Sequence, residues 1–175
     1  MKCMYAFGGK YLNTVYRVLT TCIRYTCQIG RWTYIASLEK EKYYAACTIF
    51  EGKIVLCGGF NNEILISVES YDHHENKWTD LPDMLHGRHN HVALSIDNKM
   101  FVIGGKWNLS CEVFDRVSRN FTYLKQLLTP ESFSCNVWRT YWLQNHSFPI
   151  KSNCFCLLDS HNFNICFMFE MLRFC

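Results

Sequence analysis

The chain has 175 residues and a net charge of +3 at neutral pH, so it is long enough for one domain and only weakly basic. It contains no run of lysine or arginine, which argues against nucleic acid or an anionic membrane as a partner. The first 20 residues lack a continuous apolar segment, so we expect no signal peptide, and the apolar stretch 163–174 is too short to cross a bilayer. We therefore expect a cytoplasmic protein.

Three Gly-Gly pairs, each at the end of a short apolar run, divide the sequence into repeats. The pairs are Gly8-Gly9, Gly58-Gly59 and Gly104-Gly105. Each is followed by two aromatic residues seven positions apart, namely Tyr25 and Trp32, Tyr71 and Trp78, and Phe114 and Phe121. Trp32 and Trp78 lie 46 positions apart, as do Gly58 and Gly104. A period of this length, marked in each repeat by a Gly-Gly pair and two aromatic residues, predicts repeated four-stranded units.

Each of the later two repeats begins with a predicted hairpin. Its strands are expected at 45–50 and 53–57 in the second repeat, and at 90–96 and 99–103 in the third. Two residues join the strands, and Gly, Asp and Asn at these places tolerate the positive φ of a tight hairpin turn.

A third and a fourth strand complete each of these units. The third strand, at 67–72 or 111–115, alternates in polarity, and the fourth begins at Trp78 or Phe121. The second strand is apolar at successive positions, as expected for a strand that is covered on both faces. We therefore predict an all-β fold in which four-stranded sheets stack as the blades of a β-propeller.

The first repeat is incomplete. Residues 4–7 correspond to its second strand, its first strand is missing, and the opposite end of the chain does not look able to supply one. The stretch 10–24 between its second and third strands is longer than in the other repeats, and we interpret it as a loop, where length variation is tolerated.

A Gly-Gly pair after the second strand, then Tyr, then Trp seven residues later is the pattern of the kelch repeat. The chain resembles the kelch part of the kelch-like (BTB–kelch) proteins over residues 1–128. The sequence is most similar to the usual pattern of that family at 67–72 and 99–105. The resemblance implies a six-bladed propeller whose rim loops bind a partner protein, often a substrate delivered to a cullin-type ubiquitin ligase. The BTB and helical domains that recruit the ligase in that family are not visible in this sequence.

We divide the chain into kelch repeats at 1–128 and a non-repeat tail at 129–175. The repeats comprise a partial blade at 1–38 and blades at 39–84 and 85–128, about two and a half to three blades of a propeller fragment. The last 41 residues hold five cysteines and six phenylalanines but no glycine. We expect this tail to be irregular, either disordered or divergent. Our hypothesis is that the chain is a truncated or mis-spliced reading of a longer kelch gene.

No cofactor or metal is expected, although three groups of residues carry metal-binding side chains. The groups are Cys154, Cys156, His161 and Cys166; Asp72, His73, His74 and Glu75; and His86, His89 and His91. The first has only one residue between its leading cysteines, fewer than zinc sites usually have. The second fits a solvated turn, and the third fits rim and first-strand positions. Cys3, Cys47 and Cys57 stand at apolar strand positions and are expected to be reduced, buried thiols.

The candidates for partner binding lie in the loops of one rim. They are Phe60, Asn61, Asn62, Arg88, Asn90, Lys106, Trp107 and Asn108. The resemblance implies that an arginine at the position of Arg88 lines the substrate pocket, with Asn90 nearby, although Lys42 and Tyr44 replace them in the preceding repeat. Exposed tryptophan and arginine are the residue types that dominate protein interfaces. The alternative is that all eight belong to ordinary loops.

No catalytic motif occurs, so we do not expect an enzyme. We expect a protein-protein interaction module that resembles the substrate-recognition propeller of a cullin-type ligase adaptor. Two alternatives remain: an actin- or cytoskeleton-binding kelch protein, and a fragment without a function of its own.

Overall fold

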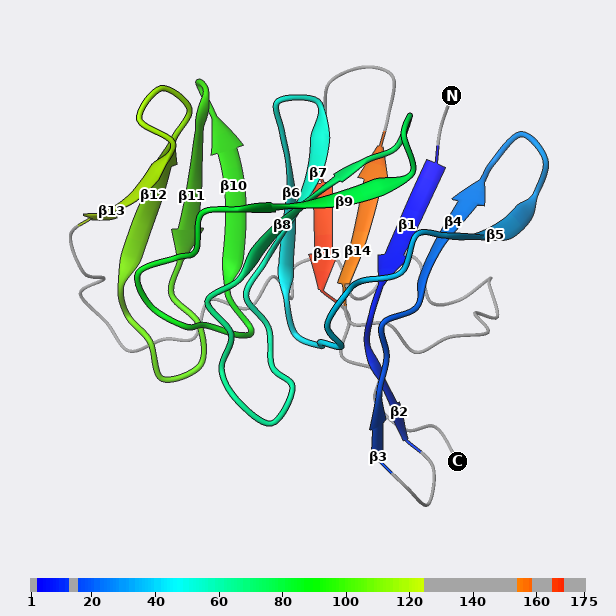
Figure 1. The fold of residues 1–175 in the computed structure, drawn as a ribbon, viewed down its shortest axis with the longest axis horizontal. Coiled ribbons are helices and arrows are strands. Elements are labelled where there is room, and N and C mark those ends of the chain that lie inside the picture. The colour runs from blue at the N-terminus through cyan, green and yellow to red at the C-terminus, as the bar shows by residue number, and fades with distance from the viewer. Residues whose placement is uncertain (1–2, 13–15, 125–153, 159–164, 169–175) are drawn as a thin grey trace.

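The computed structural model describes residues 3–12, 16–124, 154–158 and 165–168. These residues form strands and loops. Three larger antiparallel sheets stand side by side, and a small two-stranded sheet projects from the first of them (Figure 1). We call the larger sheets blades 1, 2 and 3 in chain order. Within the described residues there is no helix that could span a membrane.

Blades 2 and 3 have the four-stranded meander that the repeats predicted. Blade 2 runs in the order β6 (Ala46–Phe50), β7 (Lys53–Cys57), β8 (Val68–Asp72) and β9 (Lys77–Leu81). Blade 3 follows with β10 (Val92–Ile96), β11 (Lys99–Ile103), β12 (Cys111–Asp115) and β13 (Asn120–Leu124). The expected strand positions are therefore confirmed to within two residues.

The aromatic pairs of the repeats are cross-strand neighbours. Tyr71 lies opposite Trp78, and Phe114 lies opposite Phe121, in the pairing of the third strand with the fourth. Their ring centroids are 5.0 and 5.1 Å apart. A spacing of seven residues is thus the register of a hairpin, and paired aromatic rings stabilise such a register.

Blade 1 contains a strand from the far end of the chain, contrary to the sequence analysis. Its own strands are β1 (Cys3–Phe7), β4 (Cys22–Thr26) and β5 (Arg31–Ile35). The strand β14 (Cys154–Leu158) pairs with the free edge of β1, and β15 (Ile165–Met168) pairs with β14. Strand β14 occupies the place that β6 and β10 occupy in the other blades, and β14 and β15 both contact β6.

The expectation that the far end could not complete blade 1 was therefore wrong, and the tail is not irregular at these two strands. The physical reason is that an edge strand offers a row of unpaired N–H and C=O groups. Backbone pairing of this kind does not require the repeat motif. The lack of glycine and of the repeat pattern in the tail therefore did not indicate whether it could pair with β1.

The long stretch after Gly9 also contains regular structure. It forms β2 (Lys10–Leu12) and β3 (Tyr16–Val18), which pair as a separate hairpin below the first blade in the view of Figure 1. Among the described residues of 10–24, only 19–21 lie outside strands, so the interpretation of this stretch as a loop is wrong for β2, β3 and the beginning of β4.

Apolar side chains fill the two spaces between neighbouring blades. Between blades 1 and 2, the ring of Phe7 lies 5.3 Å from that of Trp78. Between blades 2 and 3, the ring of Phe50 lies 5.7 Å from that of Phe114. Leu38 and Met84, which follow the fourth strands, are each 3% exposed and join these two clusters. Stacking of sheets therefore supplies the core, as expected for a propeller.

The second strand is covered on both faces only in the middle of the stack. In β7, Ile54 to Cys57 are all buried, since blades flank this sheet on both sides. In β11, only Met100 and Val102 are buried, and Leu94 and Ile96 on the neighbouring β10 are 43% and 54% exposed. The prediction for β11 was therefore wrong in the described part of the chain, where a blade covers one side of blade 3.

Candidate partner-binding rim

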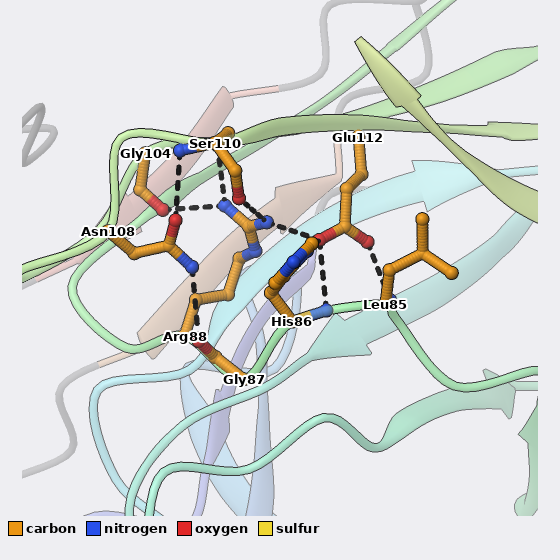
Figure 2. A network of polar contacts seen from close by, with 8 residues as sticks. All are labelled: Leu85, His86, Gly87, Arg88, Gly104, Asn108, Ser110 and Glu112. Carbon is orange, nitrogen blue, oxygen red and sulfur yellow. Dashed lines mark hydrogen bonds and ion pairs between the residues drawn. The ribbon is translucent and has the colours of Figure 1, made fainter. Parts of the chain in front are cut away.

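Arg88 lies at the centre of a buried polar network behind the rim (Figure 2). Its guanidinium is 0% exposed and donates to the Gly104 carbonyl at 2.7 Å and to the Ser110 carbonyl at 2.8 Å. A further nitrogen donates to a carboxylate oxygen of Glu112 at 2.5 Å and to the Ser110 hydroxyl at 2.8 Å. The planar donor fork of arginine suits this divided set of acceptors.

Glu112 connects the same network to the segment that leads into blade 3. Its two carboxylate oxygens accept hydrogen bonds from the backbone N–H groups of Leu85 and His86, at 2.7 and 3.0 Å. The imidazole of His86 lies 3.0 Å from the same carboxylate. The network therefore fixes the segment 85–88 onto strand β12.

Arg88 is consequently not an exposed binding residue, and this part of the sequence prediction is corrected. Sequence position alone placed Arg88 at the rim, but Glu112, 24 residues later, draws its side chain into the interior. Blade 2 contains the equivalent pair, because Lys42 is 1% exposed and its ammonium lies 3.1 Å from the Glu69 carboxylate. The cation before the first strand is thus a repeated structural element of both blades.

The other predicted residues lie in the turns of the rim that follow the Gly-Gly pairs, except Asn90, which lies in the segment that leads into β10. Trp107 is 84% exposed and has a φ of 62°, a left-handed conformation that is uncommon for tryptophan and projects its indole from the turn. Asn62 and Asn90 also have positive φ, at 84° and 53°. Asn108 has a structural role, since its side chain bonds to the Gly87 carbonyl and to the Ser110 N–H.

A continuous row of rings crosses this rim, and the sequence analysis found only part of it. We call it the aromatic stripe; its members are Tyr43, Tyr44, Phe60, His89 and Trp107. Neighbouring ring centroids in the stripe are between 4.7 and 6.3 Å apart. The members come from the segments that lead into blades 2 and 3 and from the turns that follow their Gly-Gly pairs.

A lysine ammonium stands at each end of the aromatic stripe. The Lys10 ammonium lies 5.0 Å from the centroid of Tyr43 and 5.3 Å from that of Tyr44. The Lys106 ammonium lies 4.3 Å from the centroid of Trp107. These distances are within the range of a cation–π interaction.

His89 is the buried polar group of the stripe. His89 is 5% exposed, and neither nitrogen of its ring has a hydrogen-bond partner among the described residues. Burial, and then the nearby Lys106 ammonium, lower the pKa of His89 below its ordinary value of 6.5. The imidazole is therefore neutral at pH 7.

The repeat register contained a signal for the missed residues. Tyr43 and His89 lie 46 positions apart, and their carbonyls accept equivalent hydrogen bonds from the N–H groups of Phe60 and Lys106, at 2.8 and 2.9 Å. Lys10 follows the first Gly-Gly pair as Phe60 and Lys106 follow theirs. The two informative positions are therefore that of Tyr43 and His89 before the first strand, and the residue directly after each Gly-Gly pair. Comparison of the repeats at these two positions would have identified the stripe.

The metal candidates do not form one site in the described residues, where no group of three His, Cys, Asp or Glu side chains could hold an ion. Asp72 instead accepts hydrogen bonds from the backbone N–H groups of His74 and Glu75 and pairs with Lys53. His86 binds Glu112, His89 belongs to the stripe, and His91 is 0% exposed. Cys156 pairs in register with Cys166, and His161 lies outside the described residues.

Cys3, Cys47 and Cys57 are buried among the apolar side chains between the blades. This confirms their predicted role as small hydrophobic side chains.

Comparison with known protein families supports the repeat assignment. The family described as "Kelch motif" matches residues 42–85, which span blade 2 and the segment that leads into it. The chain is 27% identical over 103 residues to Kelch-like protein 41a of Danio rerio, a match covering 58% of this chain and 17% of that protein. It is 30% identical over 109 residues to spermatocyte protein spe-26 of Caenorhabditis elegans, covering 58% and 19%.

An F-box/kelch-repeat protein of Arabidopsis thaliana is 27% identical over 107 residues, covering 58% of this chain and 25% of the relative. The matches thus span between 17% and 25% of the length of these relatives. Among solved structures, one titled "Structure of YjhT" superposes with a TM-score of 0.56 at 14% identity, covering 71% of this chain and 52% of the other. At that identity the likeness concerns the fold alone. The motif match, these relatives and the stacked four-stranded sheets together support the assignment of kelch repeats folded as blades of a β-propeller.

Proposed function

We propose that the chain binds a partner protein through the rim that carries the aromatic stripe. Kelch repeats indicate a protein-interaction module. The single observation that carries the choice of this rim is Trp107, which is 84% exposed in a backbone conformation that costs free energy. Tryptophan is among the residues that contribute most to protein interfaces.

The remaining predicted residues either form the contact surface or support it from within. In this proposal, Trp107 forms the contact surface together with Phe60, Asn61, Asn62, Asn90 and Lys106. Arg88 and Asn108 support it from behind, because their side chains hold the turn 104–110 and the segment 85–88 together. Loops positioned by a rigid sheet are the usual place for binding residues.

The wider role that we propose is substrate recognition for a cullin-type ubiquitin ligase, with recruitment of the ligase by a different part of a longer protein. Matches to a kelch-like protein and to an F-box/kelch-repeat protein support this choice. The cytoskeletal alternative predicts cosedimentation of the chain with actin filaments. The adaptor role predicts instead that the abundance of the captured partner rises when the gene is deleted.

The rim is tested by affinity capture with Trp107→Ala and Tyr44→Ala, followed by quantitative mass spectrometry. We expect each substitution to reduce recovery of the specific partner at least tenfold, the effect of losing a central aromatic contact. Val117→Ala is the matched control, since Val117 is 91% exposed in the turn at the opposite end of blade 3. Equal recovery with all three variants would show that the partner binds elsewhere.

A further inference from the structure

The aromatic stripe has an excess of positive charge that the described chain leaves unpaired. Lys10 and Lys106 stand at its two ends, and no carboxylate lies within 4.0 Å of either ammonium among the described residues. Some other cations are paired, as Lys53 is with Asp72 at 3.1 Å, but exposed lysines such as Lys77 and Lys99 also lack an ion pair among the described residues. What distinguishes this rim is that two lysine ammonium groups without a carboxylate partner lie against the rings of one aromatic surface.

The same surface contains an unsatisfied buried hydrogen-bonding group. His89 lies between the rings of Tyr44, Phe60 and Trp107, with centroid distances of 6.1, 5.4 and 6.3 Å. A neutral imidazole always carries one N–H, and a buried donor without an acceptor costs about 1–3 kcal/mol. Because Trp107 is largely exposed, a partner that takes up its indole would uncover the imidazole and could supply the acceptor.

From this arrangement we propose that the aromatic stripe binds an acidic peptide segment of the partner, in which carboxylates pair with Lys10 and Lys106 and an aromatic or aliphatic side chain packs on the rings between them. This inference rests on the proposed function and names the chemical class of the partner. Charge complementarity selects the sign of the segment, and the apolar rings provide the contact area.

One acidic group of the rim opposes this preference and provides a useful control. Glu63 is exposed in the same turn as Phe60 and makes no ion pair within the described structure. Its carboxylate repels an acidic segment, so Glu63→Gln should strengthen binding of an acidic segment while Lys→Gln substitutions at the two ends weaken it. Opposite changes from neighbouring side chains are difficult to explain by unfolding.

The test uses fluorescein-labelled random copolymers of glutamate and tyrosine, and of lysine and tyrosine, in fluorescence anisotropy titrations of the full chain. We expect the Glu,Tyr copolymer to bind more tightly. Lys10→Gln and Lys106→Gln should each weaken it about twofold to fivefold, and the double variant about tenfold. Binding should also weaken as NaCl is raised from about 50 to about 300 mM. Lys77→Gln, an exposed lysine at the opposite end of blade 2, should leave the affinity unchanged.

A pH comparison tests the part played by His89. The charged or titratable groups near it are Lys106, His91 and the stacked ring of Tyr44, and His91 is in turn near the charge of Arg88. A bound carboxylate favours the protonated imidazole, so the complex takes up a proton more readily than the free protein, and affinity should rise as the pH falls from 7.5 to 6.5. His89→Phe should abolish this rise.

Two results would overturn the inference. Tighter binding of the Lys,Tyr copolymer would mean that the rings select cations, and equal binding of the Glu,Tyr copolymer by the double lysine variant would mean that the two ammonium groups do not contact the acidic segment. Either result leaves the proposed function to be judged separately, because the Trp107→Ala capture experiment reports whether the rim binds a protein of any charge.

Discussion

Replacement of Arg88 should damage the stability of the propeller and not only its binding. In Arg88→Met, the Glu112 carboxylate stays fully buried but loses its cation, while the Gly104 and Ser110 carbonyls lose their donor. Removal of one partner of a buried ion pair costs about 3–5 kcal/mol. The backbone N–H groups of Leu85 and His86 still donate to Glu112, so we expect a value near the lower end, about 3 kcal/mol.

Arg88→Lys is the matched control, because lysine occupies the equivalent place in blade 2. There, Lys42 reaches Glu69 and also donates to the Ser67 hydroxyl at 2.9 Å. A lysine at position 88 should keep the ion pair with Glu112 and lose some of the hydrogen bonds that the guanidinium donates. We expect the free energy of unfolding to fall by about 1.5 kcal/mol, the value of one charged hydrogen bond.

The assay is urea unfolding followed by tryptophan fluorescence, with the free energy of unfolding compared among the three proteins. A loss below about 1 kcal/mol in Arg88→Met, or an equal loss in both variants, would refute the view that Arg88 supports the rim from within. Arg88→Glu should also destabilise the fold, because it would place two buried carboxylates side by side.

Two further predictions concern the segment between blades 2 and 3. Burial, and then the charge of Arg88, hold the pKa of His91 well below 6.5, so the unfolded chain binds the proton first; stability should fall by about 1.4 kcal/mol per unit as the pH decreases below about 6.5. Urea titrations between pH 7 and 5 should show a shallower slope for His91→Ala, and an unchanged slope would contradict the assignment. Gly58→Ala should lower the melting temperature by several degrees in a calorimetric scan, because a Cβ would strike the Arg88 carbonyl and the residue has a φ of 58°; a wild-type melting temperature would mean that the Gly-Gly turn can adjust.

Local sequence patterns were sufficient to predict the strands of blades 2 and 3. The strands β7, β11 and β12 have the predicted bounds, because hairpin turns, alternating polarity and aromatic pairs seven residues apart are properties of neighbouring residues. The rim position of Trp107 could be predicted for the same reason, since it follows directly from the Gly-Gly turn.

Pairings between distant segments could not be predicted in this way. The burial of Arg88 depends on Glu112, and the completion of blade 1 depends on β14, which lies about 150 positions beyond β1 in the chain. Local motifs report what a segment can form, whereas burial and pairing depend on which other segments are brought near it.

The amino-acid sequence by itself therefore determined the repeat, the fold class and the rim on which the loops gather, because these follow from the period of short-range contacts. Only the tertiary structure decided which cation is buried, which strand closes blade 1, and that Tyr44, His89 and Trp107 form one surface. Side chains from separate repeats meet only after the sheets have stacked, and stacking is driven by apolar burial that does not depend on the residues of the rim.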